Sequence, residues 1–152
     1  MPLGRKQQST SSFEQYAATV ENILAALNVN LDEARLGTEQ GFGWRFRRGS
    51  GSIEIYISEH DGRGYLQVLA PILIIPESNL LPFYRRLLEL NLQLTNAALG
   101  VYYDVVYVFS ERPLQGLDAD EANTIIMLVA AYADDLDNRL CDEFGGRLYS
   151  QV

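Results

Sequence analysis

The most informative pattern in the chain lies within residues 80–112, where an amphipathic segment is followed by two apolar ones. Apolar residues recur at steps of three and four over 80–94, and this spacing places them on one stripe of a helix. A second apolar set flanks that stripe and consists of Tyr84, Leu88 and Leu92. The apolar arc is wider than packing against one sheet requires, so it predicts two contact surfaces for this helix.

The two apolar segments after the helix, residues 97–103 and 105–112, alternate as strands do, yet both of their faces are apolar. An antiparallel sheet with one wet face shows apolar and polar residues in turn. These strands therefore predict a helix on one face of the sheet and a further cover on the other. A second subunit or a bound polypeptide would supply that cover.

The rest of the chain supplies two more helices and three more strands. They are predicted as helices at 11–28 and 118–144 and strands at 42–48, 53–58 and 64–75. Pro71 lacks a backbone donor and so marks an edge strand or a bulge. The order α-β-β-β-α-β-β-α predicts an α+β fold, with an antiparallel five-stranded sheet and flanking helices. We expect a flexible N-terminus over 1–10, a single domain over 11–146 and a C-terminal tail over 147–152.

Charge and composition argue against several classes of function. The 152 residues include 12 basic and 20 acidic side chains, a formal net charge of −8, so nucleic acid is not an expected partner. The longest apolar run, 65–76, falls short of the roughly 20 residues that span a bilayer, and the polar N-terminus lacks the apolar core of a signal peptide. One cysteine cannot form an internal disulfide. These features predict a cytoplasmic protein with no membrane partner.

The element order and the stretch LLELNLQLTNAALGVYYDVVYVFSERPLQGLDADE resemble the domain shared by type III secretion chaperones and YbjN-like proteins. The resemblance covers residues 13–144 and includes a helix that ends near Asn91, two strands joined by a turn, and a final helix capped by aspartate. The chain is most similar to an uncharacterised cyanobacterial and plastid branch. The resemblance implies a non-enzymatic homodimer that holds partner polypeptides extended along its first helix and sheet. The sequence shows no sign of a secretion context, so it does not name the client.

No group of residues typical of a catalytic or metal site is present in the sequence. His60 and Cys141 would need to lie within hydrogen-bond reach to act as a nucleophilic pair, and acidic neighbours of the thiol disfavour its thiolate. Asp134, Asp135 and Asp137 fit a solvated acidic face better than a cation site, because helical spacing brings only two of them together. We predict no catalytic residue, no metal and no cofactor.

Two groups of aromatic residues in this chain call for different interpretations. Over 44–48 they alternate with arginines, as in a strand that binds nucleic acid, but the acidic chain favours core aromatics beside solvated arginines. Tyr102, Tyr103 and Tyr107 lie on or beside the last two strands and fit an interface or an ordinary core and rim equally well.

Two functional surfaces are predicted. Surplus apolar surface indicates a homodimer, whose interface is predicted at Tyr84, Leu88, Leu92, Tyr102, Val106 and Val108. A client polypeptide is expected on the exposed sheet, by groove burial or by strand addition at the Pro71 edge. It is also expected on the first helix, at Tyr16, Val20, Ile23 and Leu27.

A chaperone-like, polypeptide-binding module is the leading prediction of function. The alternative is a cystatin-like or nuclear-transport-factor-like cone that encloses a small apolar ligand in a cavity of about 300 Å³ or more. An enzyme is the third possibility, and the chain lacks the convergent acid, base and nucleophile that it would need.

Overall fold

The chain is built from a seven-stranded sheet and the helices packed against it. The computed structural model describes residues 5–151, with side chains from residue 13 onward. The elements in chain order are α1 (Arg5–Ala26), α2 (Leu31–Ala34), β1 (Arg35–Leu36), β2 (Phe42–Arg48), β3 (Gly51–His60), β4 (Arg63–Ile74), α3 (Leu80–Asn91), β5 (Ala98–Tyr102), β6 (Val105–Pro113), α4 (Ala119–Phe144), β7 (Arg147–Leu148) and the 3-10 helix η1 (Tyr149–Gln151).

All strand pairs of the sheet are antiparallel, in the order β1-β2-β3-β4-β6-β5, and β7 pairs with β4. The α+β class and the antiparallel sheet are confirmed. The predicted number of five strands is wrong, because β1 and β7 each add a strand of two residues. The short helices α2 and η1 were not predicted either, and α1 begins at Arg5, inside the segment expected to be flexible.

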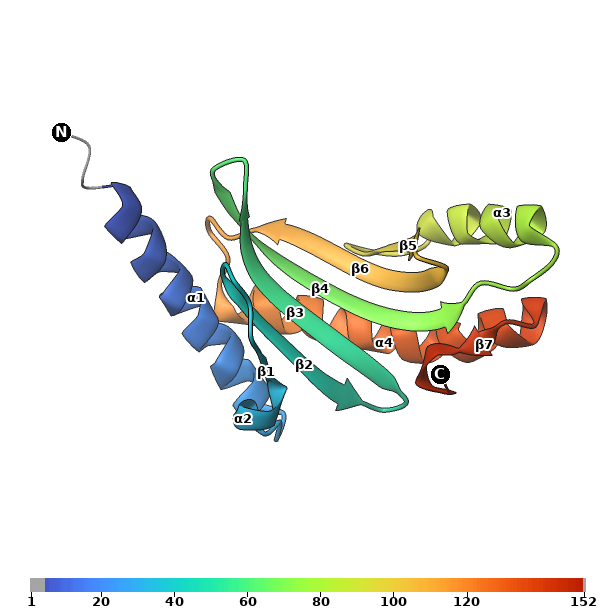
Figure 1. The fold of residues 1–152 in the computed structure, drawn as a ribbon, viewed down its shortest axis with the longest axis horizontal. Helices are drawn as coiled ribbons and strands as arrows, with labels where there is room; N and C mark the ends of the chain where they lie inside the picture. Colours follow the sequence, from blue (N-terminus) through green and yellow to red (C-terminus); the bar gives the residue numbers. More distant parts are fainter. Residues whose placement is uncertain (1–4, 152) are drawn as a thin grey trace.

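Helices cover only one face of the sheet. Figure 1 shows α4 running behind the strands, α1 beside it at the β1–β2 end, and α3 at the opposite end next to β5. The core lies between this face and the helices, and Leu24, Ile55 and Ile126 are fully buried there. The other face of the sheet is not covered by a helix of the described chain. It carries half-buried residues such as Leu69 and Tyr107.

In the strands predicted to be apolar on both faces, one face lies in the core and the other lies on the open side of the sheet. Val106 and Val108 of β6 point into the core and have no exposed surface, whereas Phe109, next along the strand, is 37% exposed on the open face. Helix α4 is bounded by the capping signals expected from the sequence. Asp118 accepts a hydrogen bond from the backbone nitrogen of Glu121 at 2.8 Å, and Gly145 ends α4 in the left-handed conformation.

Pro71 lies at a β-bulge in the interior of the sheet. β4 pairs with β6 on one side and with β3 and then β7 on the other, and its register with β6 shifts between Pro71 and Leu73. The predicted bulge is therefore present, and the prediction of an edge strand is wrong. A bulge releases Pro71 from the need to donate to the ladder, and this explains how proline is tolerated in a central strand.

Candidate functional site

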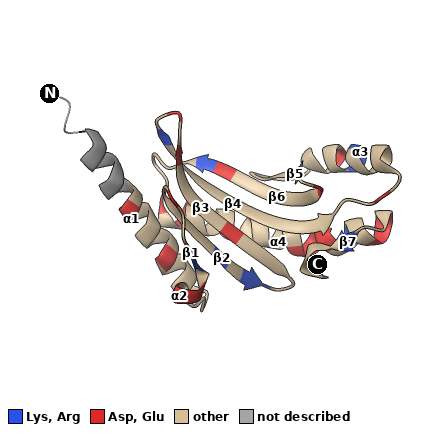
Figure 2. Ribbon diagram, in the orientation of Figure 1, with Lys and Arg blue, Asp and Glu red and all other residues tan. Residues whose placement is uncertain are grey.

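The outer side of β2 is only half covered. β1 pairs with the first half of this strand, and within the described part of the chain no strand lies beside residues 45–48 on that side. Arg48 and Gly51 face each other across a two-residue turn. Because hydrogen-bonded pairs alternate along a hairpin, Arg45 and Arg47 direct their backbone groups outward. Residues 45–48 thus present an open strand edge, called the β2 edge below, and Figure 2 shows basic residues there.

A groove with a volume of about 430 Å³ lies between α4 and the end of β2. Its apolar lining comes from α4, through Met127, Ala130 and Ala131, and Asp134 and Gly49 form polar and backbone parts of the wall. Methionine adapts its shape and alanine leaves room, so this lining suits apolar side chains of varied size. The β2 edge and this groove together offer backbone pairing and an apolar pocket side by side.

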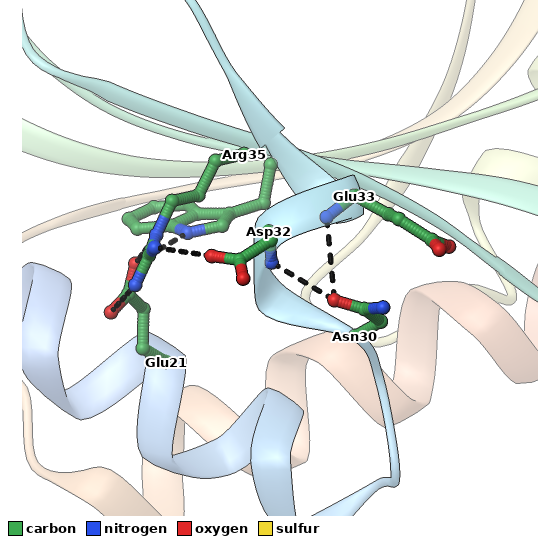
Figure 3. Close-up of polar contacts among 6 residues, drawn as sticks. Glu21, Asn30, Asp32, Glu33 and Arg35 are labelled. Carbon is green, nitrogen blue, oxygen red and sulfur yellow. Dashed lines mark hydrogen bonds and ion pairs between the residues drawn. The ribbon is translucent and has the colours of Figure 1, made fainter.

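The opposite half of β2 is fastened to α1 by the polar cluster drawn in Figure 3. The Arg35 guanidinium donates to both Glu21 carboxylate oxygens, with Nε–Oε1 at 2.7 Å and Nη2–Oε2 at 3.0 Å, and to Asp32 Oδ1 at 3.1 Å. The indole Nε1 of Trp44 donates to Glu21 Oε1 at 3.2 Å. Asn30 caps α2 by accepting from the backbone nitrogen of Asp32. The cluster holds α1, α2 and β1 against β2.

The Arg35 hydrogen bond, with a smaller contribution from Trp44, holds the pKa of Glu21 below its ordinary value of 4.5. A carboxyl with a lowered pKa in the folded state stabilises the fold above its unfolded pKa, and this stabilisation is lost as pH falls through the folded pKa. Replacing Glu21 with Gln is therefore expected to lower the free energy of unfolding at pH 7 and to have a shrinking effect below pH 4.5. Urea unfolding at pH 7, 4 and 3 measures this dependence.

Glu14, an exposed glutamate of the same helix about two turns before Glu21, provides the matched control. Glu14→Gln removes the same charge without touching Arg35, so it should leave the free energy of unfolding nearly unchanged across this pH range. Equal pH dependence in the two variants would contradict the role assigned to the Glu21–Arg35 pair.

A second exposed apolar surface lies on α3, at the other end of the sheet. The α3 stripe, defined here as Leu81, Tyr84, Leu88 and Leu92, follows one side of the helix, and its members are 81%, 37%, 68% and 90% exposed. α3 packs against β5, and the outer side of β5 has no strand partner among the described residues. An exposed apolar stripe next to an open strand edge is typical of an interface.

The structure divides the predicted dimer residues into two groups. Tyr102, at the end of β5, is 67% exposed and lies at the same end of the sheet as the α3 stripe. Val106 and Val108 are fully buried under the helices of their own chain, because the pleat of β6 turns both toward the core. They are not available at a surface. The sequence analysis missed Leu81, although it lies three residues before Tyr84 and therefore on the same side of the helix.

The predicted partner-binding residues of the first helix lie mostly inward. Val20 is 1% and Ile23 is 8% exposed, and both belong to the core that α1 forms with α4 and β3. Neither is free to contact a partner in this conformation. Tyr16 and Leu27 are half-buried against the same core and remain predicted contacts.

The candidate catalytic and metal residues are not brought together. His60 is exposed at the turn before β4, whereas the Sγ of Cys141 donates to the carbonyl oxygen of Gly146, a residue beside Ile74 at the far end of β4. About 35 Å of extended strand separates these ends. No group of three or more potential metal ligands occurs within the residues described. In the same part of the chain, no helix has the length and apolarity needed to cross a bilayer.

Comparison with known proteins identifies relatives in structure and none in sequence. No protein-family model and no curated protein matches the chain. A chain of the HopA1–SchA chaperone–effector complex is similar with a TM-score of 0.58 and 11% identity, over 84% of this chain and 97% of that chain. A chain of the ExsC–ExsE complex is similar with a TM-score of 0.63 and 9% identity, over 84% of this chain and 94% of that chain. The fold is that of a type III secretion chaperone.

This finding confirms the resemblance to a secretion chaperone at the level of the fold. The first of the two similar structures is a chaperone–effector complex, and the second is a complex of ExsC with ExsE. The likeness, at about one identical residue in ten, concerns the backbone arrangement alone. In the chaperone fold of this chain, the β2 edge and the α3 stripe lie at opposite ends of the sheet. They can therefore serve two different contacts at the same time.

Proposed function

We propose that the protein is a non-enzymatic, chaperone-like module that binds an extended segment of a client polypeptide at the β2 edge. The observation that carries this proposal is the unpaired half of β2 next to the groove lined by Met127, Ala130 and Ala131. The fold, shared with a chain of the HopA1–SchA chaperone–effector complex and a chain of the ExsC–ExsE complex, supports it.

Strand addition at the β2 edge would satisfy backbone groups that now face solvent. An extended client segment would hydrogen-bond to the outward backbone groups of Arg47, and alternate client side chains would enter the groove beside α4. The arginine side chains on this edge keep it from pairing with the wrong strand, since charged residues oppose edge-to-edge aggregation. The β2 edge is preferred to the Pro71 edge that the sequence suggested, because β4 is paired on both sides over most of its length.

The client-binding module is proposed to act as a homodimer, joined through the α3 stripe and the open side of β5. The exposed leucines and tyrosines of this surface support the proposal, because soluble monomers seldom leave a large contiguous apolar patch in water. The functions expected of a YbjN-like or secretion-linked protein stay predictions. The small-ligand alternative receives less support. In the described chain the helices cover one face of the sheet (Figure 1), and the buried core side chains fill the space between that face and the helices.

Paired substitutions at Arg47 test the β2 edge. Arg47→Pro removes an outward backbone donor, whereas Arg47→Ala removes the same charged side chain and keeps the donor. We expect the unchanged chain and the Arg47→Ala variant to capture partner proteins from extracts of the source cells. The Arg47→Pro variant should not capture them. For a purified partner, the proline variant should bind at least about tenfold more weakly, as expected for one lost backbone hydrogen bond.

The proline should leave the fold intact, because it lies on an edge and on the side of the strand that faces away from β3. Circular dichroism and the unfolding midpoint check this point. Partners retained equally by the alanine and proline variants, or an absence of reproducible partners, would contradict strand addition at the β2 edge.

A further inference from the structure

One side of β4 is left without a strand partner over a short stretch in the middle of the sheet. β3 pairs with β4 as far as Leu69, and β7 pairs with Leu73 and Ile74 on the same side. Residues 70–72 between them are paired with no strand on this side within the described chain. The strand β3 and the C-terminal segment thus meet β4 one after the other, with a gap between them (Figure 1).

A cleft with a volume of about 420 Å³ occupies this gap. Pro71 and Ile72 supply the β4 side, the β2–β3 hairpin and α4 supply two further walls, and Tyr149 and Ser150 of η1 close it from the C-terminal side. We call it the β4 cleft. Its walls come from both sides of the sheet, because Arg45 belongs to the open face and Ala133 to the buried one.

The C-terminal segment that borders the β4 cleft is held by few contacts. Its ladder with β4 is two residues long, Arg147 and Ser150 are exposed, and Tyr149 is 36% exposed. Such a segment detaches from the sheet more readily than the core strands do, because its detachment exposes little buried apolar area to water. The position of this segment against β4 depends on Gly146, because a Cβ added there would lie 2.7 Å from the carbonyl oxygen of Ile74.

Of the four charged residues that line the β4 cleft, Arg47 and Asp137 have no ion pair in the described chain, and Asp137 is the buried one. Glu54 is satisfied, since it accepts from Arg45 and from the Tyr56 hydroxyl. Asp137 is only 5% exposed, and within the described chain it forms no ion pair. Its Oδ1 accepts from the backbone nitrogen of Asn138 at 2.6 Å, and its Oδ2 is 3.1 Å from the Ser50 hydroxyl.

The Ser50 hydroxyl also lies 3.2 Å from Asp134 Oδ1, and its single proton can be donated to only one of the two carboxylates. A buried carboxylate with an unfilled acceptor position favours a basic group, because a charge-assisted hydrogen bond offsets its desolvation. Asp137 therefore gives the floor of the β4 cleft a preference for a lysine or arginine side chain.

We propose that the side of β4 that faces away from β6 at residues 70–74 is a second polypeptide-binding site, which takes an extended segment with a basic residue directed at Asp137. In the free protein, the chain's own C-terminal segment occupies part of this site as β7, and a client segment displaces it. The inference rests on the proposed function, that the protein binds polypeptides. It concerns the backbone of β4 and not that of β2, although the side chains of Arg45 and Arg47 also line the β4 cleft.

The test uses a fluorescent, end-capped peptide with the sequence of residues 146–151 and the full chain as receptor. In the Gly146→Val receptor the chain's own C-terminal segment cannot pair with β4, because the valine side chain clashes there. The peptide keeps its glycine and can still bind. The tethered segment competes at a high effective concentration, so we expect the peptide to bind the Gly146→Val chain at least about tenfold more tightly than the unchanged chain. Gln151→Val, which adds the same residue to an exposed position, should not change the affinity.

Should Gly146→Val fail to fold, Leu148→Pro releases β7 by a different route, because proline cannot donate to the ladder. Hydrogen exchange locates the bound peptide. Protection of residues 70–74 on peptide binding supports the proposal. Protection of 45–48 instead, or equal peptide affinity for the unchanged and released chains, overturns it while leaving the capture experiment at Arg47 unaffected.

A second peptide, with Lys in place of Ser150, tests the preference for a basic residue. It should bind the Gly146→Val chain about tenfold more tightly than the first peptide, as expected for a charge-assisted hydrogen bond. Asp137→Asn in the receptor should abolish this gain. Asp135→Asn, which removes an exposed carboxylate paired with Arg139, should preserve it. A gain that survives Asp137→Asn would overturn the role of that carboxylate.

Discussion

Replacing both Leu88 and Leu92 with aspartate is expected to separate the proposed dimer into monomers without lowering the stability of the single chain. Both side chains are largely exposed in the single chain, so neither contributes to its core. In a two-fold dimer each substitution acts twice. At about 1.5 kcal/mol for each of four buried leucine side chains, the loss is about 6 kcal/mol, which raises the dimer Kd by roughly 10⁴-fold.

Light scattering across micromolar concentrations measures this change as a fall in mass to the 17.1 kDa of one chain. Ala18→Asp with Ala25→Asp serves as a control, because these positions are exposed on α1 and the added charge is the same. The control should remain dimeric. A monomeric mass for the unchanged chain would refute the dimer, and a double variant that stays dimeric would move the interface away from the α3 stripe.

Trp44→Ala is expected to be strongly destabilising. The indole is 1% exposed, stacks with Phe42 at a centroid distance of 6.2 Å, and donates to Glu21. Truncation of a buried tryptophan lowers the free energy of unfolding by about 3–5 kcal/mol through lost burial and the cavity that remains. For a chain of this length the Tm should fall by roughly 10 °C.

Trp44→Phe separates the contribution of the buried aromatic ring from that of the indole hydrogen bond. It retains most of the aromatic volume and removes the indole donor, so we expect a smaller loss of about 1–2 kcal/mol. Denaturant unfolding of the two variants gives both values. An unfolding midpoint for Trp44→Ala equal to that of the unchanged chain would mean that β2 and α1 do not depend on this contact.

The long elements were predictable because each leaves a strong periodic signal. The stripe of Ile126, Val129 and Leu136 defined α4, and the alternation of isoleucines defined β3, whose buried residues are Ile53, Ile55 and Ile57. The two-residue strands β1 and β7 were not predictable. A pair of residues has no period, and pairing at these positions depends on where the neighbouring strand ends.

The functional surfaces were predicted in part, for a related reason. Helix α3 has a wider apolar arc than its packing uses, and so the exposure of Leu88 and Leu92 could be anticipated. Alternation showed that both faces of β6 are apolar but not which of them faces the core, and Val106 was misplaced as a result. The β2 edge left no sequence signal, because an unpaired strand side is a property of topology.

The opposite positions of β5 and β2 in the sheet determine how a two-site client would have to be built. From β5 to the β2 edge the order crosses four strand spacings, or about 19 Å. Two copies joined at their β5 ends would hold their β2 edges roughly 48 Å apart, with about 10 Å allowed for the junction. An extended client needs about 15 residues to bridge that distance at about 3.3 Å per residue. A client with two binding segments should therefore lose its avidity when the spacer between them is cut well below this length.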